Sequence, residues 1–300
     1  MPKSMETAKG CCPIPVTPFN ENLDVDWDDL ERVVEFCVQT GAPMVSGPIM
    51  ASEFQYLSED ERYQFMKVCA DVIGGRTVYI AGVSAPNART AAQYAEYAQK
   101  VGADCVVAMM SGGAPKFEVL YHFFKAISDA VTIPVMVQSA AQCPVKTDDA
   151  VKLCTEIENV HYVKEETPPS WTNIAKLNDR QSPFVKGIYA GHGGHEDPLD
   201  FKRGARGSIV AAYLSDMETK VWEYMLSGDM DAAYKLHSAL LPAKSLSVLK
   251  CNKEFLKRRG VIRNTYFRSD FNPLDRHDME DIDLAYKYVE PYFIWRGFSR

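Results

Sequence analysis

The sequence predicts an α/β protein, a (β/α)8 TIM barrel with a C-terminal helical extension. Short apolar runs alternate with amphipathic helical patterns for most of the 300 residues, and no long polar linker interrupts them. A doubly wound sheet is the alternative, but the Gly-rich dinucleotide turn typical of that fold is missing after the first strand. From residue 230 onward the pattern is only helical. We therefore expect a barrel catalytic domain over residues 1–228 and a helical appendage over residues 229–300.

Eight short runs rich in apolar residues are the predicted strands. They are Cys12 to Thr17, Pro43 to Gly47, Val78 to Val83, Asp104 to Met109, Ile133 to Gln138, His161 to Lys164, Phe184 to Tyr189 and Gly207 to Ala211. The predicted helices place apolar residues at helical spacing. They are Trp27 to Gln39, the segment opened by Ser58, Thr90 to Val101, Phe117 to Ala130, Asp148 to Ile157, Ser170 to Leu177, Asp216 to Leu226, Asp231 to Leu241, Ser245 to Arg259 and Met279 to Pro291. Ser58 opens a capping-box pattern, and Gly41 and Gly102 stand where helix C-caps are expected.

Composition excludes several classes of protein. With 46% hydrophobic and 24% charged residues the chain can bury a sizeable core, and its net charge of −7 argues against a nucleic-acid partner. The basic run Lys253 to Arg259 is interpreted as the solvated face of a helix. Residues 1–10 lack the apolar stretch of a secretory signal, and no apolar run of about 18 residues predicts a membrane span. The eight cysteines form no C-x-x-C pair, so we expect buried, reduced thiols in a cytoplasmic protein.

Lys164 is the strongest candidate for chemistry in the chain. It ends the sixth predicted strand on the same face as Val160 and Tyr162, and barrel enzymes place their chemistry at such strand ends. A lysine among apolar neighbours loses hydration, which lowers its pKa and frees neutral amine to attack a carbonyl. The alternative is a structural lysine paired with Glu165 or Glu166.

Other polar residues follow neighbouring strands. Gln138 ends the fifth strand, as a site residue or as a solvated strand end. Ser52 and nearby backbone amides are placed to hold a substrate carboxylate, unless Ser52 only caps a turn. His192 and His195 have a spacing too short for one helix face and are separated by glycines, so we expect a mobile loop there and no metal centre. The hydrolase motif G-x-S-x-G and the P-loop motif do not occur.

Short pieces in a fixed order extend along nearly the whole chain. They are Pro15 to Phe19, Glu53-Phe54, Leu57-Ser58, Asp60 to Arg62, Ala81 to Val83, Arg89 to Ala91, Ala98 to Asp104, His122 to Phe124, Ile133 to Val135 and Val163 to Glu165. Their order and spacing resemble the dihydrodipicolinate synthase / N-acetylneuraminate lyase superfamily. The resemblance implies a barrel with C-terminal helices, a homotetramer, and a Lys164 that forms an imine with a 2-oxo acid.

The chain also departs from this superfamily. Gln138 stands where most members carry a proton-relay tyrosine, Ile49 to Glu53 replaces their Gly-Thr-Thr-Gly-Glu turn, and Met109-Met110 replaces a further tyrosine. Lysine biosynthesis and sialic acid cleavage are therefore disfavoured. The segments Ile133 to Gln138 and Tyr162 to Pro168 instead resemble the 2-keto-3-deoxy-L-arabonate dehydratase branch, as does the segment from Lys253 to Ile262.

This resemblance implies a dehydratase of a small 2-keto-3-deoxy sugar acid that needs no metal or organic cofactor. Lys164 would form the imine, Ser52 with the amide of Ala51 would hold the carboxylate, and Gln138 would bond a substrate hydroxyl or a water. An amide does not titrate, so the base would be Glu53 or Glu166. The alternatives are a retro-aldolase that releases pyruvate, or a barrel that has lost catalysis and only binds a 2-oxo acid. A metal-dependent aldolase is disfavoured.

Overall fold

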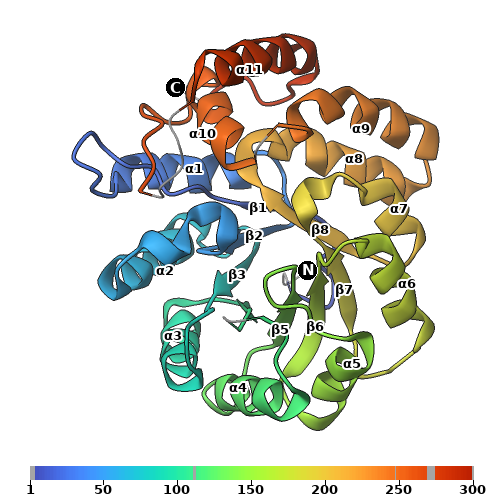
Figure 1. The fold of residues 1–300 in the computed structure, drawn as a ribbon. Helices are drawn as coiled ribbons and strands as arrows, with labels where there is room; N and C mark the ends of the chain where they lie inside the picture. The colour runs from blue at the N-terminus through green and yellow to red at the C-terminus, as the bar shows by residue number, and fades with distance from the viewer. Residues whose placement is uncertain (1–3, 111–112, 247, 269–273, 299–300) are drawn as a thin grey trace. The chain divides into compact units, whose positions relative to one another are not determined.

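The computed structural model describes residues 4–110, 113–246, 248–268 and 274–298. Within these ranges each of eight strands is followed along the chain by a helix, and further helices close the sequence (Figure 1). This repeated order is that of a (β/α)8 barrel, so the predicted fold class is confirmed. The chain forms two compact units: unit 1 is Met1–Lys9 with Gly75–Ile209, and unit 2 is Gly10–Gly74 with Val210–Arg300. The predicted domain boundary after residue 228 stays a prediction.

Unit 1 contains a run of parallel strands in which each strand is hydrogen-bonded to the next. The strands are β3 (Val78–Gly82), β4 (Cys105–Ala108), β5 (Val135–Ser139), β6 (Val160–Glu165), β7 (Gly187–Ala190) and the start of β8 (Gly207–Ala211). The helices are α3 (Ala88–Val101), α4 (Phe117–Asp129), α5 (Thr147–Glu156), α6 (Ser170–Asp179) and α7 (Asp197–Lys202). Figure 1 shows α3 and α4 side by side, and α5 packs on β6.

Unit 2 contains the first two strands and the helices from both ends of the chain. These are β1 (Gly10–Ile14), β2 (Met44–Gly47), α1 (Trp27–Gln39), α2 (Glu59–Ile73), α8 (Ser215–Ser227), α9 (Met230–Lys244), α10 (Val248–Arg258) and α11 (Arg276–Val289). β1 packs against β2 and α8, while α9 lies between α8 and α11 (Figure 1). The predicted helices of the extension are therefore present; position 247, inside one of them, lies outside the described residues.

Local signals explain where several elements begin and end. The Ser58 hydroxyl accepts a hydrogen bond from the Glu61 N–H at 3.2 Å, and the Glu61 carboxylate accepts one from the Ser58 N–H at 2.8 Å. These two bonds satisfy orphan donors at the start of α2, which confirms the predicted capping box. Gly102 ends α3 at φ 108°, a left-handed conformation in which glycine meets no Cβ penalty, so that C-cap is confirmed.

Several elements differ from the prediction. β1 is Gly10–Ile14 instead of Cys12 to Thr17, and β5 is Val135–Ser139 instead of Ile133 to Gln138. β7 is Gly187–Ala190 instead of Phe184 to Tyr189, because the chain turns at Ser182, whose carbonyl accepts the Val185 N–H at 3.2 Å. Helix α7 was not predicted. It has only 6 residues and carries a proline in its first turn, so it offers too little apolar periodicity to detect.

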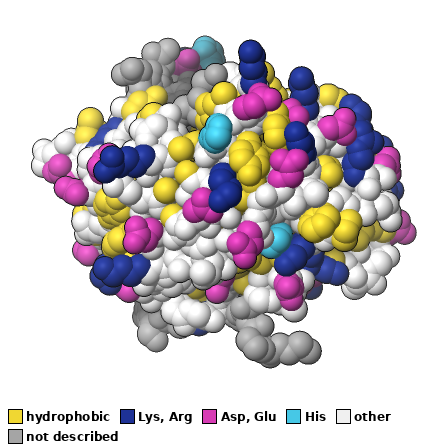
Figure 2. Space-filling view, turned by 90° about the horizontal axis from the view of Figure 1, so that it is seen from below, with side chains coloured by type: hydrophobic (Ala, Val, Ile, Leu, Met, Phe, Trp, Pro, Cys, Tyr) yellow, Lys and Arg dark blue, Asp and Glu magenta, His cyan; other side chains and the backbone are white. Residues whose placement is uncertain are grey.

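The distribution of charged side chains and of cysteines in the structure follows what the composition predicts. On the face drawn in Figure 2, basic and acidic side chains are interspersed among the described residues. All eight cysteines are buried, as predicted. Among the residues that the structure describes, none of the helices combines the length and apolar character that crossing a membrane requires.

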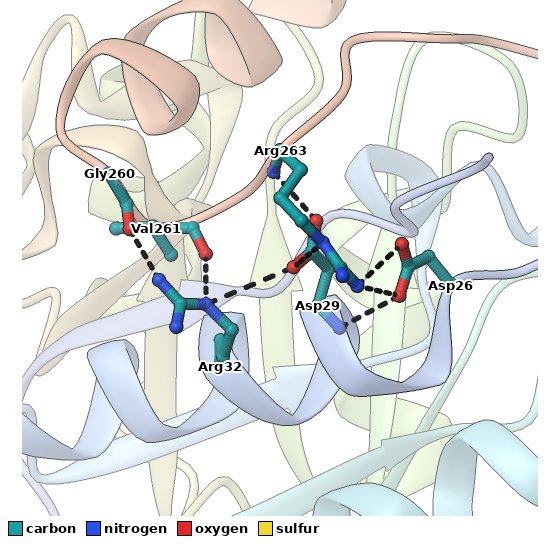
Figure 3. A network of polar contacts seen from close by, with 6 residues as sticks. All are labelled: Asp26, Asp29, Arg32, Gly260, Val261 and Arg263. Carbon is teal, nitrogen blue, oxygen red and sulfur yellow. Dashed lines mark hydrogen bonds and ion pairs between the residues drawn. The ribbon is translucent and has the colours of Figure 1, made fainter. Parts of the chain in front are cut away.

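The segment after α10 is tied to the first turn of α1 within unit 2 (Figure 3). The Arg263 backbone N–H donates to Asp29 at 2.7 Å, and its guanidinium donates to Asp29 at 3.1 Å and to both oxygens of Asp26. Arg32 donates in the other direction, from Nε to the Val261 carbonyl at 2.9 Å. The Asp29 side chain is only 1% exposed, so these donors supply the partners that a buried carboxylate needs. The network fastens two parts of the sequence more than two hundred residues apart.

Candidate active site

Strands β5, β6 and β7 bring three side-chain positions into one row. The register pairs Gln138 with Lys164, and Lys164 with Tyr189. Because the strands are parallel, their carboxyl ends meet at one edge of the sheet, where barrel enzymes carry out their chemistry. The structure thus brings two of the predicted site residues, Gln138 and Lys164, to adjacent positions near the end of their strands.

Lys164 is buried and has a carboxylate partner. Its side chain is 2% exposed, and its Nζ lies 2.9 Å from Glu166 Oε1. This contact is expected if Lys164 has only a structural role and pairs with a neighbouring glutamate. It is equally what a nucleophilic amine requires, because a buried ammonium group needs an acceptor for its proton before it can attack a carbonyl. The contact therefore does not exclude the chemical role.

Glu166 is the centre of a small cluster of donors. Besides Lys164, Oε1 accepts from the Gln138 side-chain amide, and Oε2 accepts from the His192 backbone N–H at 3.2 Å. Burial alone would raise the pKa of the Glu166 carboxyl, but the Lys164 charge and these hydrogen bonds outweigh it and hold that pKa below its usual value. Glu166 is therefore ionised at neutral pH and accepts protons only when Lys164 or a substrate supplies them.

Gly191 makes the close approach of Glu166 possible. A Cβ atom at position 191 would lie 2.3 Å from Glu166 Oε2 and 2.8 Å from Glu166 Cβ. Both distances are far below van der Waals contact, so any other residue at position 191 must displace the glutamate. The glycine after β7 thus fixes the position of a carboxylate that follows β6.

Gly191→Ala is expected to lower the rate of imine formation by about 10²-fold, because it moves Glu166 away from the Lys164 amine. The measurement is the rate at which borohydride traps a pyruvate adduct. Gly102→Ala is the matched control: its φ of 108° makes it costly for stability, but no atom lies within 4 Å of its Cβ. If both variants lose stability and neither loses trapping rate, Gly191 has no influence on the site.

Glu165 points to the other face of β6 and has a different environment. Its Oε1 accepts the Thr167 N–H at 2.7 Å, and the Thr167 hydroxyl lies 2.9 Å from the Ser139 hydroxyl. Burial raises the pKa of the Glu165 carboxyl to about 7, although these hydrogen bonds oppose the rise. Two consecutive glutamates therefore have opposite pKa shifts, and the one in contact with Lys164 is Glu166.

Ser52 and Ala51, the predicted carboxylate-binding residues, lie in unit 2 in a short 3-10 helix, Met50–Ser52. The Ser52 hydroxyl donates to the Pro15 carbonyl at 2.7 Å and accepts the Ile49 N–H at 3.3 Å. The Ser52 carbonyl accepts from the Thr17 hydroxyl. These bonds are those of a turn-capping serine, the alternative given for it from the sequence. Binding of a substrate carboxylate by Ser52 and Ala51 stays a prediction.

Glu53, the other candidate base, is engaged elsewhere in unit 2. Its Oε1 lies 2.5 Å from Lys253 Nζ, and both side chains are almost fully buried. Lys253 also donates to the Tyr266 carbonyl at 2.7 Å and lies over the rings of Phe19 and Phe267. Burial lowers the pKa of Lys253 to about 8, although the Glu53 carboxylate opposes the shift. The other candidate base, Glu166, contacts Lys164 directly.

The interpretation of Lys253 to Arg259 as a solvated helix face is wrong for both of its end residues. Lys253 is 1% exposed, and the Arg259 side chain is 2% exposed and pairs with Asp216 at 2.7 Å. A signal for Lys253 was available, because residue 253 lies three positions before the apolar Leu256 and so shares its helix face. The intervening Lys257 is exposed, as expected.

The segment after β7 forms a 3-10 turn, His192–Gly194, followed by His195 and Glu196. Ligand atoms of the three polar side chains lie within 4.8 Å of one another. From the sequence, the short spacing and the glycines favour a mobile loop over a metal centre here. The difference arises because the backbone of this turn is not that of a regular helix, as Gly193 has φ 67°.

Comparison with known proteins places the chain in a family. Residues 7–287 match the Dihydrodipicolinate synthetase family. The 4-hydroxy-tetrahydrodipicolinate synthase of Pelodictyon phaeoclathratiforme is 26% identical over 264 residues, 84% of this chain and 87% of that protein. The L-2-keto-3-deoxyarabonate dehydratase of Azospirillum brasilense is also 26% identical over 264 residues, 85% of each chain. The crystal structure of the dihydrodipicolinate synthase of Rhodopseudomonas palustris has a TM-score of 0.87 at 21% identity, covering 96% of this chain and 100% of that one.

A (β/α)8 barrel with this match is an enzyme of the class I aldolase and lyase type, whose members work through a Schiff base. The match covers most of the chain. The protein belongs to the Dihydrodipicolinate synthetase family.

Proposed function

We propose that the protein is a dehydratase that acts on a small 2-keto-3-deoxy sugar acid through an imine on Lys164. The observation that carries the proposal is the contact between the buried Lys164 amine and Glu166, which also accepts hydrogen bonds from Gln138 and His192. The similarity to an L-2-keto-3-deoxyarabonate dehydratase supports this choice of substrate class. In the superfamily that the sequence resembles, a tyrosine relays protons where this chain has Gln138. We assign that work to Glu166.

In the first stage Lys164 passes a proton to Glu166, and the neutral amine adds to the C2 carbonyl carbon. The C2 oxygen takes one proton back from Glu166 and a second from the attached nitrogen and leaves as water, and a protonated imine remains beside the ionised Glu166. Its positive charge withdraws electrons from C3 and makes the C3 protons acidic. The covalent adduct itself is the electron sink in this scheme.

In the second stage the Glu166 carboxylate removes one C3 proton and forms an enamine. The enamine electrons expel the C4 hydroxyl, which takes the proton from Glu166 and leaves as water. Hydrolysis of the resulting imine consumes one water, restores the Lys164 amine and releases the unsaturated 2-oxo acid. Gln138 cannot act as the base because an amide does not titrate; its side-chain N–H instead orients Glu166.

The same adduct permits cleavage of the C3–C4 bond, so a retro-aldolase is the alternative enzyme. The test is incubation with 2-keto-3-deoxy-L-arabonate followed by product identification by mass spectrometry. We expect 2-oxoglutarate semialdehyde, formed by loss of water and tautomerisation. Pyruvate would instead establish the retro-aldolase. Binding without any product would support a barrel that has lost catalysis. Assembly as a homotetramer, implied by the family resemblance, stays part of this proposal.

A further inference from the structure

The turn after β7 brings together three side chains that metal ions prefer. His192, His195 and Glu196 each present a ligand atom, and all three atoms lie within 4.8 Å of one another. Two imidazoles and a carboxylate are the donor set of many zinc sites that keep one coordination position open. The cluster belongs to unit 1 and is made by a continuous stretch of five residues, so no other part of the chain is needed to assemble it.

The separation between His192 and Glu196 fits both a direct hydrogen bond and a shared ion. Nδ1 of His192 lies 3.3 Å from Oε2 of Glu196. A good hydrogen bond to a carboxylate is shorter, about 2.7–2.9 Å. By contrast, two ligand atoms at about 2.0–2.1 Å from a tetrahedral zinc ion are separated by about 3.3 Å. The observed spacing is therefore compatible with two ligands of one tetrahedral ion, which would replace the direct contact.

The tautomer of His195 is the one that many metal-binding histidines have. Its Nδ1 lies 2.6 Å from the His192 carbonyl oxygen, which is only an acceptor, so Nδ1 carries the proton. The lone pair is then on Nε2. A ligating histidine commonly donates its other ring N–H to a backbone carbonyl, which fixes the tautomer and the ring orientation.

The backbone explains how neighbouring residues converge in this way. Gly193 and Gly194 have φ near 67° and 68°, and His192 has φ 51°. Three consecutive left-handed residues fold the chain so tightly that the two imidazole centroids lie 5.4 Å apart. The glycines supply this conformation without the Cβ penalty that other residues meet.

We propose that His192, His195 and Glu196 bind a divalent transition-metal ion, for which Zn²⁺ is the representative, with a fourth position open to water. Two imidazole nitrogens favour Zn²⁺, Ni²⁺ or Co²⁺ over the oxygen-preferring Mg²⁺ and Ca²⁺. Entry of the ion is possible because the His192 side chain is 49% exposed and Glu196 is 21% exposed. The proposed ligands are side-chain atoms of this turn, whereas its contact with Glu166 is made by the backbone N–H of His192.

The test is calorimetric titration of ZnCl₂ into tag-free protein stripped with a chelator, with bound Co²⁺ absorption in the visible region as a second readout. We expect saturable binding of one ion per chain and the spectrum of tetrahedral Co²⁺. His192→Ala, His195→Ala and Glu196→Gln should each weaken binding by at least about tenfold. Thermal melting verifies that each variant is folded, which is expected because the changes lie in a partly exposed turn.

His277→Ala is the matched control. His277 is an exposed histidine whose Nδ1 lies 3.4 Å from a Glu280 carboxylate oxygen, the same pairing without a second histidine. The variant should bind Zn²⁺ like the unmodified protein. The proposal is overturned if no saturable binding occurs, if the three site variants bind as tightly as the unmodified protein, or if His277→Ala loses binding to the same extent.

Discussion

Lys164→Arg is expected to abolish imine formation and to lower turnover by a thousandfold or more, on the order of the loss when a covalent nucleophile is removed. Arginine keeps the positive charge that the buried Glu166 carboxylate requires, so the ion pair at 2.9 Å has a replacement. A guanidinium is never deprotonated in proteins and cannot attack a carbonyl. The variant therefore separates the structural role of Lys164 from its chemical role. The measurement is mass spectrometry after treatment with pyruvate and borohydride.

Lys253 is the internal control for this experiment. Like Lys164 it is buried beside a glutamate, and burial lowers its pKa to about 8, so its amine is a plausible competitor for the carbonyl. We expect the added mass on the peptide that contains Lys164 and none on the peptide that contains Lys253. The proposed mechanism would be contradicted if borohydride trapped the adduct on Lys253, or if Lys164→Arg trapped as much adduct as the unmodified protein. Lys164→Ala should also fail to trap and should melt at a lower temperature, because Glu166 then loses its counter-ion.

Glu166→Gln is expected to slow removal of C3 protons by about 10²–10⁴-fold, the usual contribution of a general base. The amide is nearly the same shape as the carboxylate and still accepts hydrogen bonds, but it cannot take a proton. Exchange of the pyruvate methyl protons with deuterium, followed by NMR, measures this step directly because it needs only the imine and a base. Borohydride should still trap an adduct on the variant, although more slowly because Glu166 also takes the Lys164 proton, so that loss of exchange is distinguished from loss of the imine.

The pH dependence of the exchange gives a second readout. Lys164 and the hydrogen-bond donors hold the pKa of Glu166 below its usual value, so the base stays ionised until the pH falls below the ordinary carboxyl pKa of about 4.3. Glu165, whose pKa is raised to about 7, would instead lose its charge just below neutrality. An exchange rate that falls below pH 7 and is abolished by Glu165→Gln would therefore argue for Glu165 and against Glu166 as the base. Otherwise Glu165→Gln should change the rate only slightly.

Most of the fold could be predicted from the sequence because each strand–helix unit has a hydrophobic pattern and capping residues within a short stretch of chain. The capping box at Ser58 and the left-handed Gly102 are encoded in a few adjacent residues, and the structure contains both. Helix α7 escaped prediction because six residues cannot express a helical period. The start of β7 was misplaced because a turn at Ser182 interrupts an otherwise strand-like run.

Only part of the candidate active site could be predicted from the sequence. Lys164 can be found from its place at a strand end, but the choice of Glu166 over Glu53 depends on contacts that the chain order does not express. Glu166 meets Gln138 from 28 positions away and approaches Gly191 from 25 positions away. The pairing of Lys253 with Glu53 spans 200 positions. Local periodicity carries no information about such distant partners.

The division of the chain has a consequence for synthesis on the ribosome. Unit 2 is made of two pieces, and its contacts include those that join Arg263 to Asp26 and Asp29 (Figure 3). The earlier piece leaves the exit tunnel first, yet these acidic side chains acquire their arginine partner only after more than two hundred further residues have been added. Residues 75–209, by contrast, emerge as one stretch and can begin to pack while translation continues. We therefore expect residues 75–209 to pack during translation before unit 2, which needs its second piece, residues 210–300.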